Sequence, residues 1–378
     1  MAVKAKSKKG SIRTVDIDSL STSFRETGCI PMDLALTNGK GLPEGSSILF
    51  YATSGCGKTT IYADMTKHLL ERALEKGESY KVVYVDVEGS RELLLSMGLG
   101  PYIASGDLIL KEGAITFAQL EELYTKILSW HEDPENPKND EEYKDVKAVI
   151  VDSLTMVQSQ ALIEKAVDDG DFGSNAKERI RFYPKYFSRC KAAGVTNLYI
   201  TQIRVAQGAV AFAEQTKAAI SSSDMFYFDI VMKGTKSEKA QKDAEKVTVN
   251  TAFGKMEMQS RCVVTIKSDK GSWVKNRYGH FPEVSILLEF GKRVVTSYTV
   301  REMLINLGYV TDKGSGYYLI GQVINDILGG NYETTKNVRK KEVNTMVSQN
   351  LETIVQFLKS ENRFRILDTQ EDIYDDGL

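Results

Sequence analysis

The sequence is poor in cysteine and has almost no net charge, and both absences exclude classes of protein. Its four cysteines lie far apart and form no CxxC pair. This argues against a zinc module and a secreted disulfide scaffold, and favours a reduced cytoplasmic environment. The 49 basic and 51 acidic residues leave a net charge of −2. Any contact with nucleic acid therefore has to come from local basic patches.

Long apolar segments are also absent. No run approaches the ~18 apolar residues of a membrane helix. The basic start of the chain precedes no apolar core, so we expect neither a membrane span nor a signal peptide. What is present is ordinary globular composition, 42% hydrophobic and 26% charged, in a chain long enough for two or three domains. We therefore expect a soluble, cytoplasmic protein.

Short apolar runs alternate with helical stretches from about residue 28 onward. The runs expected to be strands span residues 47–51, 82–85, 148–151 and 197–200. A helix is expected over about 58–76, directly after the first run. Continuous apolar runs of this length are typical of parallel strands buried on both faces. The pattern therefore predicts an α/β core.

Changes in composition divide the chain into segments. These are a basic N-terminal arm and docking segment over 1–27, the α/β core over 28–297, a small helical C-terminal domain over 298–367 and an acidic tail over 368–378. The tail has acids and no bases, which is typical of disorder. Within the core, 131–145 is expected to be a solvated loop and 235–246 a solvated hairpin or helix.

The strongest chemical signal lies between the first strand and its helix. It is the run Ala52-Thr53-Ser54-Gly55-Cys56-Gly57-Lys58-Thr59-Thr60. Small, Gly-rich residues let backbone N–H groups turn inward around phosphates, and the helix N-terminus adds its dipole. Lys58 is expected to reach the β- and γ-phosphates, and Thr59 to bind Mg²⁺. Residues 54–60 therefore predict a nucleoside triphosphate site. Ala52 stands where the strict pattern has Gly, and it would be strained there if that position required a positive φ.

Polar residues follow the other predicted strands. Asp152 ends the third strand, where such folds hold Mg²⁺ through water, so we assign it to the metal together with Thr59. Glu88 follows the second strand and is assigned as the carboxylate that activates the attacking water. Asp86 is the competitor, and its position nearer the strand favours a structural role. Gln202 ends the fourth strand, where its amide can hydrogen-bond the γ-phosphate and report its loss.

A long segment of small residues, 205–224, follows Gln202 and Arg204. A loop of this length in a compact domain is either functional or a mere linker, and the composition alone leaves both open.

Taken together, these residues resemble the RecA family of homologous-recombination ATPases, including its phage UvsX-type members. The resemblance rests on the order of the phosphate loop, Glu88, Asp152-Ser153 and Gln202-Ile203-Arg204, and on the segments that precede the loop. Those segments are Gly10–Arg13, Thr27–Leu36 and Gly41–Gly45. The likeness covers about 10–310 well and the C-terminal domain weakly. It implies a P-loop NTPase core with a mainly parallel sheet flanked by helices.

The resemblance also implies site residues. Glu88 is the catalytic base, Lys58 a catalytic phosphate contact and Gln202 the switch between nucleotide and DNA. Two DNA-binding loops are implied at 156–173 and 203–223. The implied DNA contacts are Lys177, Arg179 and Arg181 on the helix after the first loop, which also bears Lys185, and Arg204, Phe212, Ser221, Ser222 and Ser223 in the second.

Filament-forming members of this family complete the ATP site with basic residues of the neighbouring subunit. Here Lys267 matches such a residue, Asp269 occupies a usually basic position, and Lys270 can substitute after a one-residue shift. Ile12 resembles the residue that docks into the adjacent subunit. The long N-terminal helix of bacterial RecA is absent, and the adenine site is altered because the chain is about two residues shorter there.

We therefore predict a DNA-dependent ATPase and strand-exchange recombinase. It would form a helical filament on single-stranded DNA with ATP and Mg²⁺ and pair that strand with homologous duplex DNA. Loading or single-strand-binding proteins are further expected partners, in a nucleoid or a phage-infected cell. Two alternatives remain: a hexameric helicase with the same core, and a RecA-like scaffold that binds nucleotide or DNA without hydrolysis.

Overall fold

The computed structural model describes most of the chain. The described residues are 22–37, 39–159, 174–205, 216–236, 246–251, 254–259, 261–267, 275–278, 283–289 and 291–360. The predicted N-terminal arm up to 21 and the acidic tail lie outside them, as do 160–173 of the first predicted DNA loop and 206–215 of the second. Ile12, Phe212, Asp269 and Lys270 also fall outside.

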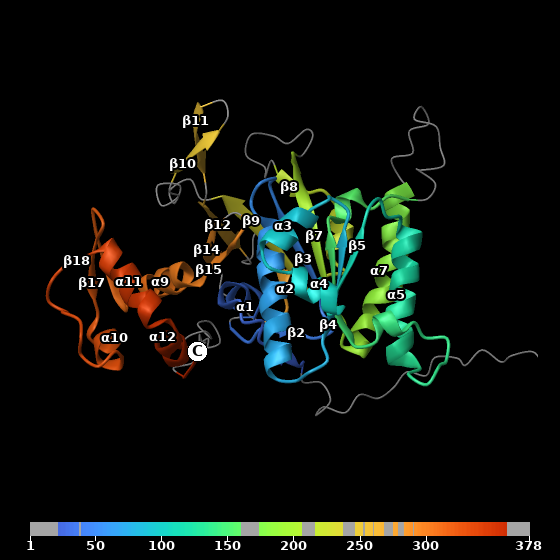
Figure 1. The fold of residues 1–378 in the computed structure, drawn as a ribbon, viewed down its shortest axis with the longest axis horizontal. Coiled ribbons are helices and arrows are strands. Elements are labelled where there is room, and N and C mark those ends of the chain that lie inside the picture. The colour runs from blue at the N-terminus through green and yellow to red at the C-terminus, as the bar shows by residue number, and fades with distance from the viewer. Residues whose placement is uncertain are drawn as a thin grey trace, which may run out of the picture.

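A central sheet of eleven strands organises the molecule (Figure 1). Its parallel part has the order β9-β3-β7-β6-β4-β5. These strands are β3 (Ser47–Ala52), β4 (Lys81–Asp86), β5 (Leu108–Glu112), β6 (Val146–Asp152), β7 (Thr196–Val205) and β9 (Ile230–Lys236). The four strands expected from the apolar runs are all present, and all are parallel. Strands β5 and β9 were not anticipated.

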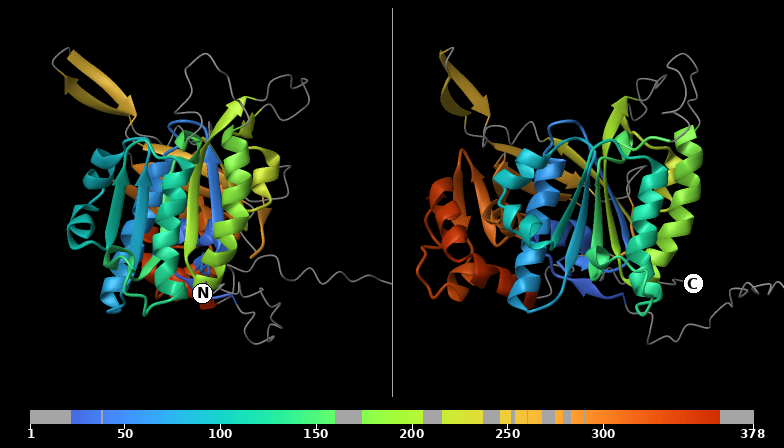
Figure 2. Two further views of the ribbon diagram at one scale, coloured as in Figure 1. Left: turned by 90° about the vertical axis from the view of Figure 1, so that its right-hand side faces the viewer. Right: turned by 45° about the vertical axis from the view of Figure 1, so that its right-hand side comes forward.

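Antiparallel strands extend the sheet beyond β9. They are β12 (Arg261–Lys267), β14 (Glu283–Glu289) and β15 (Arg293–Val295), with β13 (Lys275–Asn276) beside β9 and β8 (Thr216–Ala218) beside β7. Two small two-stranded sheets lie apart: β1 (Phe24–Arg25) with β2 (Leu42–Pro43), and β10 (Lys246–Thr251) with β11 (Gly254–Gln259). The β10–β11 hairpin projects from the body of the molecule (Figures 1 and 2).

Helices cover both faces of the sheet (Figure 2). Helices α5 (Phe117–Glu132) and α7 (Ser174–Ala193) pack on one face, while α1 (Ile30–Thr37) and α2 (Lys58–Glu75) pack on the other. Shorter helices are α3 (Arg91–Ser96), α4 (Gly100–Ser105), α8 (Ser222–Met225) and the 3-10 turns η2 (Glu141–Tyr143) and η3 (Leu154–Met156). Together with the sheet, these layers confirm the predicted α/β fold with a mainly parallel central sheet.

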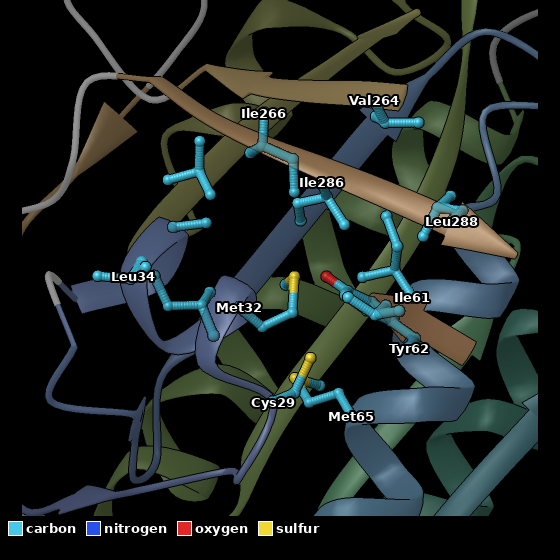
Figure 3. Packing of buried hydrophobic residues seen from close by; sticks show 14 of the residues in the cluster. Cys29, Met32, Leu34, Ile61, Tyr62, Met65, Val264, Ile266, Ile286 and Leu288 are labelled. Atoms are coloured by element: carbon cyan, nitrogen blue, oxygen red, sulfur yellow. The ribbon is translucent and has the colours of Figure 1, made fainter. Parts of the chain in front are cut away.

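Alternate residues of each strand enter separate cores, as the two-residue period of a strand requires. In β3, Ile48 and Phe50 belong to the core under α1 and α2, whereas Leu49 and Tyr51 belong to the core under α5 and α7. Figure 3 shows the first core, where side chains of α1, α2, β12 and β14 meet. Both faces of the parallel strands are therefore buried.

The C-terminal part is mixed rather than purely helical. Its helices are α9 (Thr296–Asn306), α10 (Gln322–Ile327), α11 (Lys340–Gln349) and α12 (Leu351–Ser360). A three-stranded antiparallel sheet lies among them, formed by β16 (Val310–Gly314), β17 (Tyr317–Ile320) and β18 (Val338–Arg339). The sequence analysis missed these strands because they are short. β16 and β18 are largely exposed, and the alternating burial of β17 spans only four residues.

The structure describes all of the hydrophilic stretch 131–145 but only part of the stretch 235–246. Most of 131–145 is an exposed loop, as expected, although α5 runs to Glu132 and Tyr143 is buried. Of 235–246, β9 covers the first two residues, and 237–245 lie outside the described residues. None of the described helices combines the length and the apolar character needed to cross a membrane.

Candidate nucleotide-binding site

The loop between β3 and α2 has the backbone that phosphate binding requires. Gly55 and Gly57 adopt φ values of 70° and 69°. This is a left-handed backbone conformation that residues other than Gly rarely adopt. A Cβ at Gly57 would also lie 2.3 Å from Leu288 Cδ1 of β14. The positive φ and the packing of Leu288 therefore both favour Gly at this position, and the chain continues from it directly into Lys58, the first residue of α2.

Lys58 lies across the loop that precedes it. Its ammonium donates hydrogen bonds to the carbonyl oxygens of Ala52 (3.2 Å) and Thr53 (3.1 Å). Burial lowers the pKa of Lys58, while the nearby charges of Glu88 and Asp152 oppose that shift. Because its direct partners are neutral carbonyls, the ammonium is well placed to bind an anion.

Thr59 and Asp152 form the pair expected of a magnesium site. Thr59 Oγ1 and the Tyr84 hydroxyl both donate to Asp152 Oδ2, at 2.6 and 3.0 Å. The other carboxylate oxygen, Oδ1, is buried and has no hydrogen-bond partner. Burial raises the pKa of Asp152 to about 6. A buried carboxylate oxygen without a hydrogen-bond partner, beside a hydroxyl group, fits a Mg²⁺ ion that these two groups would coordinate directly or through a water molecule.

No group of three or more His, Cys, Asp or Glu side chains gathers as a metal site within the described ranges. Thr59 and Asp152 could therefore supply only part of the coordination of Mg²⁺, with phosphate and water oxygens completing it, as is usual for this ion.

Glu88, just beyond the end of β4, meets Gln202 of β7. Gln202 does not end its strand as expected, because β7 continues to Val205, where it pairs with β8. Gln202 Nε2 donates to Glu88 Oε1 at 3.4 Å, and Ser153 Oγ donates to the same oxygen. Asp86 accepts from the backbone N–H groups of Gly89 (2.9 Å) and Ser90 (2.6 Å). Asp86 thus shapes the turn that carries Glu88.

The sheet register explains why these groups converge. Ala52 is paired with Gln202, and Asp86 with Asp152, across neighbouring parallel strands. The carboxyl ends of parallel strands meet at one edge of a sheet, where ligands of open α/β sheets bind. Lys58 and Thr59 of α2 are therefore brought together with Glu88, just beyond β4, with Asp152 of β6 and with Gln202 of β7.

Ala52 is the last residue of β3 and does not have a positive φ. The strain considered for this position is therefore absent. Its neighbour on β9 is Gly234, where a Cβ would lie 3.0 Å from the Ala52 Cβ. The missing side chain at Gly234 makes room for the methyl group of Ala52.

The residues expected to contact DNA are only partly free to do so. Lys177 and Arg181 are exposed on α7. Arg179, in contrast, donates from Nε to the fully buried Asp224 Oδ2 at 3.0 Å, and its own side chain is only 14% exposed. In this structure Arg179 is a structural ion-pair residue, and we leave it out of the DNA surface. Lys185 pairs with Glu121 at 2.6 Å.

The serines of the second predicted loop cap a helix. Ser221 Oγ accepts from the Asp224 N–H at 3.2 Å and forms a capping box at the start of α8. Ser223 is exposed and bonds Ser221 through the two hydroxyl groups at 2.8 Å. Ser222 is the first residue of α8, and Arg204 lies near the end of β7.

Lys267 ends β12, and its Nζ pairs with Glu283 Oε2 at 3.3 Å. Successive residues of a strand point to opposite faces of the sheet, so the burial of Val264 and Ile266 shows which face Lys267 occupies. They belong to the core under α2, as even-numbered residues of this strand do, so Lys267 lies on the opposite face of the sheet from α2.

Sequence reasoning missed β9 and its last residue, Lys236. The apolar run Ile230-Val231-Met232 was a signal for this strand, because it is followed by the same kind of polar end as the other parallel strands. Lys236 is exposed and faces the phosphate loop.

No protein-family model matches the chain. Curated proteins named protein RecA do match it. The chain is 24% identical over 343 residues to that of Wolbachia sp. subsp. Drosophila simulans (strain wRi), spanning 90% of this chain and 82% of the relative. It is 23% identical over 341 residues to that of Ehrlichia chaffeensis (90% and 81%), and 23% over 299 residues to that of Marinobacter nauticus (79% and 74%). The chain thus has a distant RecA-like relationship, in agreement with its α/β core.

Proposed function

We propose that this chain is a DNA-dependent ATPase and strand-exchange recombinase. It would assemble with ATP and Mg²⁺ on single-stranded DNA and pair that strand with homologous duplex. The observation that carries the proposal is the convergence of Lys58, Thr59, Glu88, Asp152 and Gln202 at one edge of the sheet. A phosphate loop alone would support nucleotide binding, whereas this set also supports hydrolysis and its coupling to other segments.

Each residue has a distinct task in this proposal. The backbone N–H groups of residues 54–60 and the Lys58 ammonium bind the triphosphate, and Thr59 with Asp152 holds Mg²⁺. Magnesium, when bound, neutralises charge on the phosphate oxygens. Glu88 orients a water molecule and accepts its proton. The Gln202 amide, 3.4 Å from Glu88 Oε1, responds to the γ-phosphate.

Hydrogen bonds support coupling between this site and the two predicted DNA loops. Thr155 directly precedes the first predicted loop, and its Oγ1 bonds Thr201 Oγ1 at 2.9 Å and accepts from the Gln202 N–H at 3.4 Å. Gln202 directly precedes the second loop region. A change at the γ-phosphate would therefore reach the starts of both loops through Gln202, in the manner of a nucleotide-dependent switch.

The proposed DNA surface uses Lys177 and Arg181 on α7 together with the second loop region, 203–223. Exposed cations bind phosphates without regard to base sequence. A recombinase needs this property because it has to accept any strand. We therefore expect the affinity for mixed-sequence single strands to fall steeply as the salt concentration rises.

Assembly completes the ATP site in this proposal. Lys267 lies on the face of the sheet opposite α2, so it is suited to reach the nucleotide of a neighbouring copy rather than its own. Lys270 is the second proposed contact of this kind, and Ile12 the proposed docking residue. Two ammonium groups supplied in trans would make hydrolysis depend on assembly.

The test is ATP hydrolysis by the full chain with and without single-stranded DNA, beside a Glu88→Gln variant. We expect DNA to raise the rate, and the variant to lose at least about a hundredfold in rate while still binding nucleotide, because a general base is removed. Bound nucleotide without turnover under either condition would contradict the proposal and favour a scaffold. Closed rings of fixed subunit number in electron micrographs would instead favour a hexameric helicase.

A further inference from the structure

Lys236 lies against the phosphate loop, although no sequence pattern marks it as a nucleotide-binding residue. It ends β9, and its side chain is exposed. A Cβ built on Gly55, in the middle of the loop, would lie 3.3 Å from Lys236 Nζ. Gly55 has no such atom, so the ammonium approaches the loop backbone itself.

The architecture of the sheet explains this position. Strand β9 is the parallel neighbour of β3, with Gly234 beside Ala52. Lys236 comes two residues later and therefore points to the same face of the sheet as Gly234. Met232 lies on that same face, because it too is an even-numbered residue of β9, and it is buried in the core under α2. Lys236 is thus on the α2 face of its own chain, whereas Lys267 is on the other face.

The charge of Lys236 has no counterpart in the part of the chain that the structure describes. None of the salt bridges between described residues involves its ammonium. The neighbouring residues of the loop, Thr53 and Ser54, are neutral and exposed. Lys58 holds the inner side of the loop through the carbonyls of Ala52 and Thr53. Two cations of one chain therefore flank a loop whose N–H groups bind anions.

We propose that Lys236 is a second phosphate-binding cation in cis, which contacts the polyphosphate of the nucleotide bound by its own chain. This inference rests on the proposed function, because it assumes that the loop binds a nucleoside triphosphate. It gives the unassembled chain part of its affinity for nucleotide before any neighbouring copy supplies Lys267.

The experiment measures binding of methylanthraniloyl-ATP with Mg²⁺ to the full chain, without DNA and at a concentration where it does not assemble. Loss of one charged hydrogen bond to phosphate predicts that Lys236→Ala weakens affinity about tenfold. Lys236→Arg keeps the charge and should stay within about threefold of the parent. Lys313→Ala, on the exposed face of β16, removes the same charge far from the loop and should change nothing.

Competition with inorganic tripolyphosphate identifies the part of the nucleotide that Lys236 contacts. The Lys236→Ala variant should weaken tripolyphosphate binding by the same factor as nucleotide binding. A loss for the nucleotide but not for tripolyphosphate would overturn the inference, as would an affinity equal to that of the parent. Unchanged thermal unfolding of the variant excludes a folding defect.

Failure of the proposed function gives a different result. In that case the parent chain binds no nucleotide, or Lys58→Ala binds as well as the parent, and the inference about Lys236 fails with it. Binding that Lys58→Ala abolishes and Lys236→Ala leaves intact would overturn only the inference.

Discussion

Ala52 and Gly234 form a pair of small residues across β3 and β9, at the point where the phosphate loop begins. A side chain at position 234 would meet the Ala52 Cβ at 3.0 Å and the Phe50 ring at 2.9 Å. Phe50 is fully buried under α2, so the ring has little room to move. The methyl group of Ala52 is therefore tolerated because its neighbour on β9, Gly234, has no side chain.

We expect Gly234→Ala to destabilise the protein by about 1 to 3 kcal/mol, the usual cost of overpacking a core. Equilibrium unfolding in urea measures the change. Gly100→Ala is the matched control, because its nearest atom, Leu95 Cδ2, lies at an ordinary 3.5 Å. Adding Ala52→Gly to Gly234→Ala should recover part of the loss by removing one of the two contacts. Equal stability of the two glycine variants would contradict this account.

Helix α7 shows how one element divides its basic residues between structure and surface. Lys177 and Arg181 are four residues apart and exposed on one side. Arg179 lies on another side, near the buried Tyr183, and pairs with Asp224. Asp224 also accepts from the Ser221 N–H at 3.0 Å. The pair therefore connects α7 to the capping box of α8, at the end of the second predicted DNA loop.

Arg179→Ala should therefore lose folding stability, whereas Arg181→Ala should lose affinity for DNA. Arg179→Ala leaves a buried carboxylate unpaired and should cost about 3 to 5 kcal/mol of folding stability. Arg181→Ala should leave stability within about 0.5 kcal/mol of the parent, as is usual for an exposed residue. Its affinity for a labelled single strand, followed by fluorescence anisotropy, should fall severalfold and depend less on salt. A stable Arg179→Ala protein, or an Arg181→Ala protein with full DNA affinity, would contradict this division.

At the scale of the whole molecule, the two faces of the sheet separate the candidate nucleotide site of the chain from the residue proposed to act on a neighbour. Lys58 and Lys236 belong to the α2 face, and Lys267 to the opposite face. A head-to-tail assembly can join opposite faces of successive copies and continue as a helical filament. In such an assembly Glu88 and Lys267 of one ATP site come from different subunits.

Mixing two inactive variants tests this arrangement. Glu88→Gln and Lys267→Ala chains should each hydrolyse ATP poorly on single-stranded DNA. In an equal mixture, about a quarter of the sites combine an intact Glu88 with an intact Lys267 from the neighbour, if subunits mix at random. Activity of the mixture should therefore exceed that of either variant alone, and dilution below the assembly concentration should remove the gain. A mixture no more active than the average of its parts would show that Lys267 does not act in trans.

The sequence alone was sufficient for features that depend on neighbours along the chain. The strands over 47–51 and 148–151 and the helix from Lys58 follow from local apolar spacing. The grouping of Lys58, Asp152 and Gln202 could also be predicted, because each lies at or beyond the end of an apolar run expected to be a parallel strand, and such strands end at one edge of a sheet. The short strands of the C-terminal part could not be predicted, since two of them are largely exposed and the alternation in the third, β17, spans only four residues.

Only the tertiary structure decided what the individual charged residues contact. Arg179 and Arg181 are equally basic in the sequence, yet one pairs with a buried carboxylate and the other faces solvent. Lys236 and Lys267 end neighbouring strands, yet they lie on opposite faces of the sheet. Local patterns determine where strands and helices form. The face that a side chain occupies and the partner it meets depend on strand register and packing between residues far apart in the chain.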